Sequence, residues 1–495
     1  MGAGVNVMRF LRAALSSTIA VPRKAAPSPM PRLLHGRPIR RTPTAMSAVV
    51  HTPRVASGLQ PLAVGDVARS IVWEGEAPVS LQTFLAQVRG VAAVLPAGRH
   101  AVNLCEDRYR FLVAFCAVAL RGQTTLLPPS RAPAVVTDVL AQYPDSYSLG
   151  DLTLAQMPPG YWQLPDVLPQ LQGEPPQVDD QAVVAIGFTS GSTGSPKPNP
   201  KTWAAFRAST GQNLAALYDL WHGHAQPNIV ATVPPQHMYG MELSVLMPLL
   251  APACVHAARP FFPEDIARVL AAMPEPRLLA TTPVHLRALV ESGVLLPRLC
   301  GIVSATAPLS QELAAAAEAH FHCEVREVFG STETCVIARR RTARESAWTP
   351  LPGVTVQPRP DGALVQATHL PLPVMLADLV ELQDDGGFQL RGRSADLLEI
   401  AGKRASLGDL TRRLLAIPGV VDGVVLQLES SEAKGVARVA ALVVAPGLEE
   451  AAILAALRQG IDPVFLPRPL KRVAALPRSE TGKLPRTELL QLLRL

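Results

Sequence analysis

The stretch that decides the fold reads Val183-Val-Ala-Ile-Gly-Phe-Thr-Ser-Gly-Ser-Thr-Gly-Ser-Pro-Lys197, an apolar run followed at once by a polar loop. The run predicts a buried strand. Two glycines let the loop turn tightly and aim its N–H groups at an anion, while hydroxyl groups and a lysine add donors. The loop residues expected to contact phosphate are Thr189, Ser190, Gly191, Ser192, Thr193, Gly194 and Lys197. The spacing is not that of a Walker A loop, and a flexible polar surface turn is the alternative interpretation.

On both sides of this stretch, short β-branched runs alternate with helical patterns, which indicates βαβ units and a parallel sheet. The expected strands are 101–104, 124–127, 229–233, 278–281, 301–304 and 324–328. The expected helices are 81–94, 108–121, 241–250, 265–273 and 311–321. Residues 151–180 are rich in Pro, Gln and Asp without periodicity, so we expect a long connection there.

Toward the C-terminus the pattern changes twice. Residues 351–392 alternate short strands with Pro and Gly turns, which predicts a small β-subdomain. The remaining residues predict a compact α+β unit. We therefore expect an α/β protein with a basic leader over 1–47, a large N-terminal domain of βαβ-type sheets over 48–392 and a small C-terminal domain over 393–495.

Composition and charge exclude several classes of protein. The 495 residues are 48% apolar and 17% charged, which excludes a long disordered chain and predicts a large core. The net charge of +6 would usually suggest nucleic acid as a partner. However, residues 1–65 hold nine basic and no acidic residues, which leaves 37 basic and 40 acidic residues, a charge of −3, in the rest. We therefore expect no nucleic-acid partner.

The cysteines and the apolar runs indicate the compartment. Six cysteines occur without a C-x-x-C pair, mostly in apolar runs, so we expect reduced core thiols rather than disulfides or a metal site. No apolar run is long enough to span a bilayer. A cytoplasmic location is the resulting prediction. The Arg-rich leader resembles a transit peptide, but a disordered leader or a start codon assigned too early, with a plausible beginning at Met46, is the favoured interpretation.

Further motifs follow in a fixed order along the chain. They are Ser304-Ala-Thr-Ala-Pro-Leu309, Phe329-Gly-Ser-Thr-Glu-Thr334, Leu376-Ala-Asp378, Gly392-Arg393 and Leu476-Pro-Arg-Ser-Glu-Thr-Gly-Lys483. With the loop at 189–197, this set resembles the adenylate-forming (ANL) superfamily, which includes acyl-CoA synthetases, aryl-acid ligases and peptide-synthetase adenylation domains. The resemblance covers roughly residues 66–495 and implies an AMP-binding N-terminal domain with a mobile C-terminal lid.

The resemblance implies a role for each motif. Phe329 would cover the adenine, Thr332 would contact the α-phosphate, and Glu333 would hold Mg²⁺, a hard cation that prefers oxygen ligands. Ser304 and Ala305 would line the adenine and acyl pocket. The remaining implied contacts are the ribose with Asp378, the ribose and phosphate with Arg393, and the reacting acyl and phosphoryl groups with the catalytic Lys483.

The implied reaction has two steps. A carboxylate attacks the α-phosphorus of ATP, expels pyrophosphate and forms an acyl-adenylate, and a pantetheine thiol then takes the acyl group. The cofactors would be ATP, Mg²⁺ and either CoA or the 4'-phosphopantetheine of an acyl carrier protein, which is a possible partner. An adenylating enzyme with a non-thiol acceptor or luciferase-like chemistry, and a non-catalytic nucleotide-binding relative, are the alternatives.

The acid is only partly constrained. His237 resembles the gate of the acyl pocket, although a packed loop histidine is the alternative. Met238 stands where amino-acid-activating relatives have an Asp, and an apolar group cannot compensate a buried cation. Glu242 could replace that Asp. We expect an aryl acid or a short to medium acyl acid, and residues 392–407 resemble ligases of aryl polyene pigment pathways.

Four features depart from the family pattern or lie beside it. Ala395 replaces the first of two acids at the expected hinge, and Glu399 replaces a common Lys. Both lie where the thiol would arrive, so the second step is the less secure prediction. Cys335 stands where Gly is frequent, and we interpret it as a core thiol. Residues 339–341, three arginines, could meet an acidic carrier protein, although a solvated charged face is the default interpretation.

Overall fold

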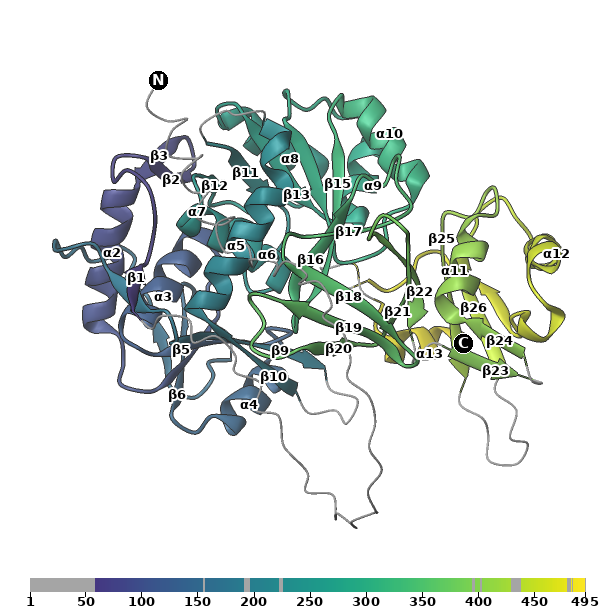
Figure 1. Ribbon diagram of the computed structural model, residues 1–495, viewed down its shortest axis with the longest axis horizontal. Coiled ribbons are helices and arrows are strands. Elements are labelled where there is room, and N and C mark those ends of the chain that lie inside the picture. Colours follow the sequence, from purple (N-terminus) through teal and green to yellow (C-terminus); the bar gives the residue numbers. More distant parts are fainter. Residues whose placement is uncertain are drawn as a thin grey trace, which may run out of the picture.

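The computed structural model describes residues 58–154, 156–190, 196–221, 226–393, 397–400, 403–428, 438–478, 482 and 484–494. Two large sheets form the body of the protein (Figure 1). The smaller one has six strands in the order β10-β9-β5-β4-β6-β7, parallel except for β10. Its strands are β4 (His100–Asn103), β5 (Thr124–Leu127), β6 (Ser146–Gly150), β7 (Tyr161–Gln163), β9 (Val183–Ser190) and β10 (Pro196–Thr202).

The larger sheet has nine strands in the order β17-β16-β15-β14-β13-β11-β12-β2-β3. Its six central strands are parallel, and β3, β16 and β17 pair antiparallel at the two edges. The strands are β2 (Ser70–Glu74), β3 (Ala77–Ser80), β11 (Asn228–Ala231), β12 (Cys254–His256), β13 (Arg277–Thr281), β14 (Gly301–Ser304), β15 (Val325–Ser331), β16 (Cys335–Arg340) and β17 (Thr349–Pro350). Parallel strands need crossover connections, and helices supply them here.

The body's helices begin at polar caps and bury apolar faces. Ser80, Asp107, Thr202, Thr282 and Ser310 each accept a hydrogen bond from a backbone N–H of the helix that follows. The helices are α2 (Leu81–Val94), α3 (Arg108–Leu120), α4 (Pro133–Gln142), α5 (Trp203–Leu217), the 3₁₀ turn η1 (Tyr218–Trp221), α8 (Pro263–Ala272), α9 (Pro283–Ser292) and α10 (Gln311–Phe321).

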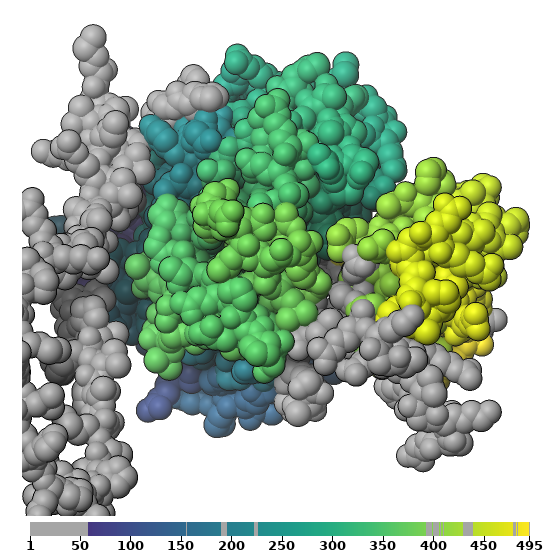
Figure 2. Space-filling view, turned by 45° about the vertical axis from the view of Figure 1, so that its right-hand side comes forward, coloured from purple at the N-terminus to yellow at the C-terminus, as the bar shows by residue number. Residues whose placement is uncertain are grey.

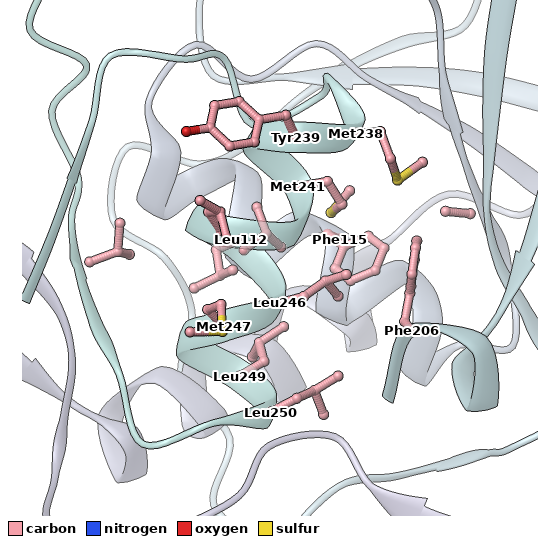
Figure 3. Packing of buried hydrophobic residues seen from close by; sticks show 14 of the residues in the cluster. Leu112, Phe115, Phe206, Met238, Tyr239, Met241, Leu246, Met247, Leu249 and Leu250 are labelled. Atoms are coloured by element: carbon pink, nitrogen blue, oxygen red, sulfur yellow. The ribbon is translucent and has the colours of Figure 1, made fainter. Parts of the chain in front are cut away.

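The expected helix over 241–250 is longer and less regular than predicted. It consists of α6 (Met238–Met241), a π-helical segment η2 (Glu242–Leu246) and α7 (Met247–Leu250). All of its residues are buried, and Figure 3 shows them packing against Leu112, Phe115 and Phe206 of α3 and α5. Because α5 contacts β10 of one sheet and β16 of the other, this helical layer joins the two sheets.

Small β-hairpins complete the N-terminal body. They are built from β18 (Val354–Arg359), β19 (Gly362–Ala367), β20 (Val374–Leu376), β21 (Asp378–Leu382) and β22 (Phe388–Arg393). The β-rich character predicted for 351–392 is thus observed. The expected connection over 151–180 is interrupted by β7 and by β8 (Gln177–Asp179), which pairs with β1 (Leu59–Pro61). That correction reflects long-range pairing, which a sequence without periodicity does not reveal.

The C-terminal residues form a lobe beside the body, drawn in yellow in Figures 1 and 2. Its core, which includes Leu410, Leu414, Val425 and Ile453, is a cluster separate from those of the body. The elements are β23 (Leu397–Ile400), β24 (Lys403–Ser406), α11 (Leu407–Leu415), β25 (Asp422–Leu428), β26 (Arg438–Val444), α12 (Glu450–Gly460), η4 (Pro463–Phe465), β27 (Leu470–Arg472) and α13 (Arg486–Arg494).

The largely parallel sheets of the body, with their crossover helices, confirm the predicted α/β class.

Two expectations about the whole chain can be compared with the structure. All six cysteines are free, and Cys105, Cys116, Cys254 and Cys335 are buried. Across the described ranges, no helix is both long and apolar enough to cross a membrane.

Candidate functional site

The glycine-rich loop connects two antiparallel strands. Thr189 of β9 lies opposite Lys197 of β10, so the loop forms the tip of a hairpin at the edge of the six-stranded sheet. Gly191, Ser192, Thr193 and Gly194 lie outside the described residues, as does the side chain of Ser190. The three prolines of β10 are tolerated because an edge strand has one side without ladder partners.

The predicted metal-binding motif forms the tight turn between β15 and β16. Ser331 and Thr334 bond reciprocally, each backbone N–H donating to the other's hydroxyl at 3.1 and 3.2 Å. A Cβ on Gly330 would lie 2.1 Å from the carbonyl oxygen of Cys335, so only glycine permits this approach. Cys335 itself has φ of 59°, a left-handed conformation that explains why glycine suits this position.

Residues from three distant segments meet beside this turn. A Cβ on Gly187 of β9 would lie 2.7 Å from Cγ2 of Thr332 and 3.4 Å from Cε of Met238. A narrow pocket is lined by these three residues together with His237 and Pro129, among others. The structure therefore brings the predicted α-phosphate contact, the predicted acyl gate and the strand that leads into the glycine-rich loop to one place.

Glu242 is committed to the fold. The residue is 1% exposed, and its carboxylate accepts hydrogen bonds from Ser209, Asn213 at 2.8 Å and the backbone N–H of Val336 at 3.0 Å. Burial raises the pKa of Glu242, and these hydrogen bonds oppose that shift. To bind a substrate ammonium, as the sequence suggested, Glu242 would have to give up hydrogen bonds from these three internal donors.

The predicted adenine and acyl segment follows β14. Ser304 and Ala305 are buried, and Oγ of Ser304 has no hydrogen-bond partner among the described residues. Glu327 of β15 fixes the end of this segment, because its carboxylate accepts from the backbone N–H of Leu309 at 3.1 Å and from Arg340 at 2.8 Å. Burial nevertheless raises the pKa of Glu327.

Three further predicted nucleotide contacts lie on β15, β21 and β22. Asp378 of β21 lies directly opposite Arg393 of β22, although nothing in their spacing of 15 residues required it. The ring of Phe329 lies 5.4 Å from that of Trp348 and 6.1 Å from that of Phe388, so its position is fixed by aromatic packing.

Lys483 lies outside the described residues, and the described residue beside it in the chain is Gly482. Gly482 is buried, and a Cβ there would lie 3.2 Å from Cγ2 of Val284 and 3.9 Å from Cβ of Ala307. The Gly482 carbonyl accepts a hydrogen bond from Arg478 at 2.8 Å. The C-terminal lobe thus contacts the body beside the segment that contains Ser304.

The chemistry of the donor set fits Mg²⁺ bound together with a nucleotide. Within the described ranges, no group of three or more His, Cys, Asp or Glu could hold a metal ion by itself. Mg²⁺ usually takes one or two carboxylates and completes its shell with phosphate oxygens and water. Glu333 is partly exposed, so its carboxylate can supply the protein's share.

Two of the arginines considered for carrier-protein contact are occupied internally. Arg340 pairs with Glu327 at 2.7 Å and lies 4.4 Å above the ring of Trp348, and Arg341 pairs with Glu318 at 2.8 Å. The side chains of Arg340 and Arg341 are 17% and 25% exposed, so this charged face is partly solvated, and carboxylates of α10 and β15 pair with its charges. Two polar residues near the turn, Lys201 and His369, were not predicted, since no local pattern reveals that they are buried.

Comparison with known proteins identifies a family and several relatives. The sequence matches the family described as AMP-binding enzyme over residues 54–381. A 4-coumarate–CoA ligase of Rhodobacter capsulatus is 31% identical over 304 residues, 60% of this chain and 74% of the relative.

Solved structures share the fold. ATP-bound MatB from Rhodopseudomonas palustris superposes with a TM-score of 0.72 at 19% identity, covering 87% of this chain and 96% of that one. The amide bond synthetase McbA from Marinactinospora thermotolerans gives a TM-score of 0.70 at 18% identity, with 86% and 97% coverage.

Proposed function

Because the chain belongs to the AMP-binding enzyme family, we propose that it activates a small carboxylic acid with ATP, forms an acyl-adenylate and transfers the acyl group to a pantetheine thiol. The observation that supports this most is the meeting of Thr332, His237 and β9 around one pocket. These segments are far apart in sequence, and the predicted triphosphate, α-phosphate and acyl contacts need to be adjacent for one in-line displacement.

The proposed roles are those that the resemblance to the adenylate-forming superfamily implies. Backbone and hydroxyl groups of 189–197 bind the β- and γ-phosphates, and Thr332 binds the α-phosphate. Asp378 and Arg393, whose backbones pair in register between β21 and β22, orient the ribose. Mg²⁺ on Glu333, when bound, neutralises charge on the triphosphate. Lys483 stabilises the charge that develops where acid and phosphate join.

The acid is proposed to lack an α-ammonium group. Met238 and Gly187 make the wall near Thr332 apolar, and Glu242 already accepts three internal hydrogen bonds. A buried ammonium at this wall would lose its hydration, and Glu242 would not be available to compensate its charge. An aryl acid, or a short to medium acyl acid, fits such a wall, and the relative from Rhodobacter capsulatus is named for an aryl acid.

The acceptor is proposed to be the thiol of CoA, with the 4'-phosphopantetheine of a carrier protein as the second candidate. Curated relatives named as CoA ligases favour CoA. The ion pairs of Arg340 and Arg341 reduce the positive charge that this face could offer to an acidic carrier protein. An acceptor other than a thiol is tested alongside, since an amide bond synthetase has the same fold.

The first test is ATP–pyrophosphate exchange with a panel of aryl and aliphatic acids. Glu333→Gln should lower exchange at least about 100-fold, because it removes the charge that holds Mg²⁺. Lys483→Ala should do the same. Glu312→Gln, on the exposed face of α10, is the matched control and should leave exchange unchanged.

Outcomes of this test separate the candidate functions. Near-normal exchange in both Glu333→Gln and Lys483→Ala would contradict the assignment. Exchange without thioester formation on either CoA or carrier protein would favour a non-thiol acceptor. Binding of ATP without exchange for any acid would favour a non-catalytic relative.

A further inference from the structure

Lys201 is a buried cation directly behind the turn that carries Glu333. Lys201 lies in the edge strand β10, yet it is only 5% exposed. Nζ donates a hydrogen bond of 2.6 Å to the carbonyl oxygen of Glu333. Because β10 belongs to the six-stranded sheet and Glu333 lies between two strands of the nine-stranded sheet, this single bond joins the sheets at the turn.

Lys201 has no carboxylate within ion-pairing distance in the part of the chain that the structure describes. Burial raises the pKa of Glu242 and of the Cys335 thiol, and the charge of Lys201 opposes both shifts. Removing an ammonium from water without a paired carboxylate is costly, and an apolar side chain of the same length would serve packing better. A role in packing alone therefore does not account for this lysine.

Two further backbone groups of the turn, the carbonyl of Thr334 and the N–H of Val336, are also bound by buried side chains. Nε2 of His369 and the carbonyl oxygen of Thr334 are 2.6 Å apart, and the N–H of Val336 donates to the carboxylate of Glu242. His369 is 4% exposed, and burial together with the charge of Lys201 lowers its pKa to about 4. A neutral ring with its proton on Nε2 is the donor that the Thr334 carbonyl requires.

We infer that Lys201 is a positioning residue for adenylate formation, whose hydrogen bond fixes the main chain of Glu333 and thereby the carboxylate that would hold Mg²⁺. This inference rests on the proposed function. A buried ammonium suits the task because a charged donor makes a stronger bond to a carbonyl than a neutral one. The hydrogen bond also connects the turn at Glu333 to β10, the strand that follows the glycine-rich loop. It would therefore hold the turn and the loop at a fixed distance from each other.

The test compares Lys201→Met with Lys201→Arg and with the control Arg69→Met. Arg69 is a partly buried cation that also donates to main-chain carbonyls, those of Val64 at 2.9 Å and Ala253 at 3.0 Å, but it lies in the β2 region away from the turn. For each variant we would measure thermal unfolding, exchange kinetics, the Mg²⁺ concentration for half-maximal exchange, and Mg·ATP affinity by calorimetry without any acid.

Lys201→Met should lower the kcat of exchange about 10- to 100-fold and raise the half-saturating Mg²⁺ concentration several-fold, with little change in KM for the acid. Lys201→Arg should recover part of the loss. Arg69→Met should lower the unfolding temperature and leave Mg²⁺ dependence unchanged. A Lys201→Met enzyme that loses stability but keeps wild-type kcat and Mg²⁺ dependence would overturn the inference, as would an equal Mg²⁺ shift in Arg69→Met.

Two provisions keep the result decisive. If Lys201→Met does not fold, His369→Leu, which frees the neighbouring carbonyl, should show the same Mg²⁺ shift, and its absence would count against the inference. If the wild-type protein catalyses ATP–pyrophosphate exchange with none of the acids tested, the proposed function fails independently of Lys201. The Mg·ATP titration still decides the role of Lys201, because it needs no acid, and equal affinities in wild type and Lys201→Met would refute it.

Discussion

His369 makes the stability of the protein depend on pH. Burial lowers its pKa to about 4, whereas an unfolded histidine titrates near 6.5. Between these values the unfolded chain binds more protons, so the stabilisation is complete above pH 6.5 and is lost as pH falls toward 4. The free energy of unfolding should fall with a slope approaching about 1.4 kcal/mol per pH unit from this residue.

The prediction is checked by urea unfolding followed by tryptophan fluorescence between pH 7.5 and 4.5. His369→Leu should be less stable than wild type at pH 7.5 but should lose less stability on acidification. The histidines at 100, 256 and 285, whose pKa values burial also lowers, would supply the remaining slope in both proteins. Identical slopes for wild type and variant would show that His369 is protonated as readily in the folded protein as in the unfolded one.

At the scale of single residues, the sequence predicts only those candidate site residues that lie in local motifs. Asp378 and Arg393 were named from motif resemblance, and the structure places them opposite each other in one hairpin. Lys201 could not be named, because a lysine in a proline-rich edge strand is usually exposed. Only the pairing of β10 with β9, and the approach of β16, bury it.

At the scale of elements, periodicity predicts where helices and strands lie but not their irregularities. The helix over 311–321 and the strand over 301–304 have the predicted bounds. The π-helical segment Glu242–Leu246 was not predicted, because its wider turn depends on the neighbours that its buried face meets rather than on composition.

Two helical glycines provide opposite predictions for the same substitution. A Cβ on Gly211 of α5 would have no atom within 4 Å, so Gly211→Ala should stabilise the protein by about 0.5–1 kcal/mol through helix propensity and leave exchange activity unchanged. A Cβ on Gly90 of α2 would lie 2.0 Å from the carbonyl oxygen of Pro169, so Gly90→Ala should destabilise by about 2–4 kcal/mol.

Both variants are measured by urea unfolding at fixed pH. The two changes should have opposite signs relative to wild type, because helix propensity acts alike in both and only Gly90 faces a backbone atom. A stabilised Gly90→Ala protein would mean that α2 can move away from the 169 segment at little cost.

At the scale of the whole molecule, the described C-terminal residues have a core of their own and contact the body through a few segments. The change in sequence pattern near residue 393 predicted such a unit. Where its loop docks could not be predicted, because that depends on the orientation of one lobe relative to the other. The burial of Gly482 against Val284 and Ala307 makes that orientation testable.

Gly482→Ala should impair adenylate formation selectively. Gly482 has φ of 80°, where alanine is strained by about 1–2 kcal/mol, and the added Cβ would lie 3.2 Å from Val284. Both effects weaken docking of the loop that carries Lys483, so ATP–pyrophosphate exchange should fall about 10-fold. Thioester formation from a supplied acyl-adenylate should be nearly unchanged, because the resemblance implies a mobile C-terminal lid and we expect that lid to withdraw the loop before this step. Gly447→Ala, with open space around its Cβ, is the control, and equal losses in both half-reactions would show that the loop remains docked throughout.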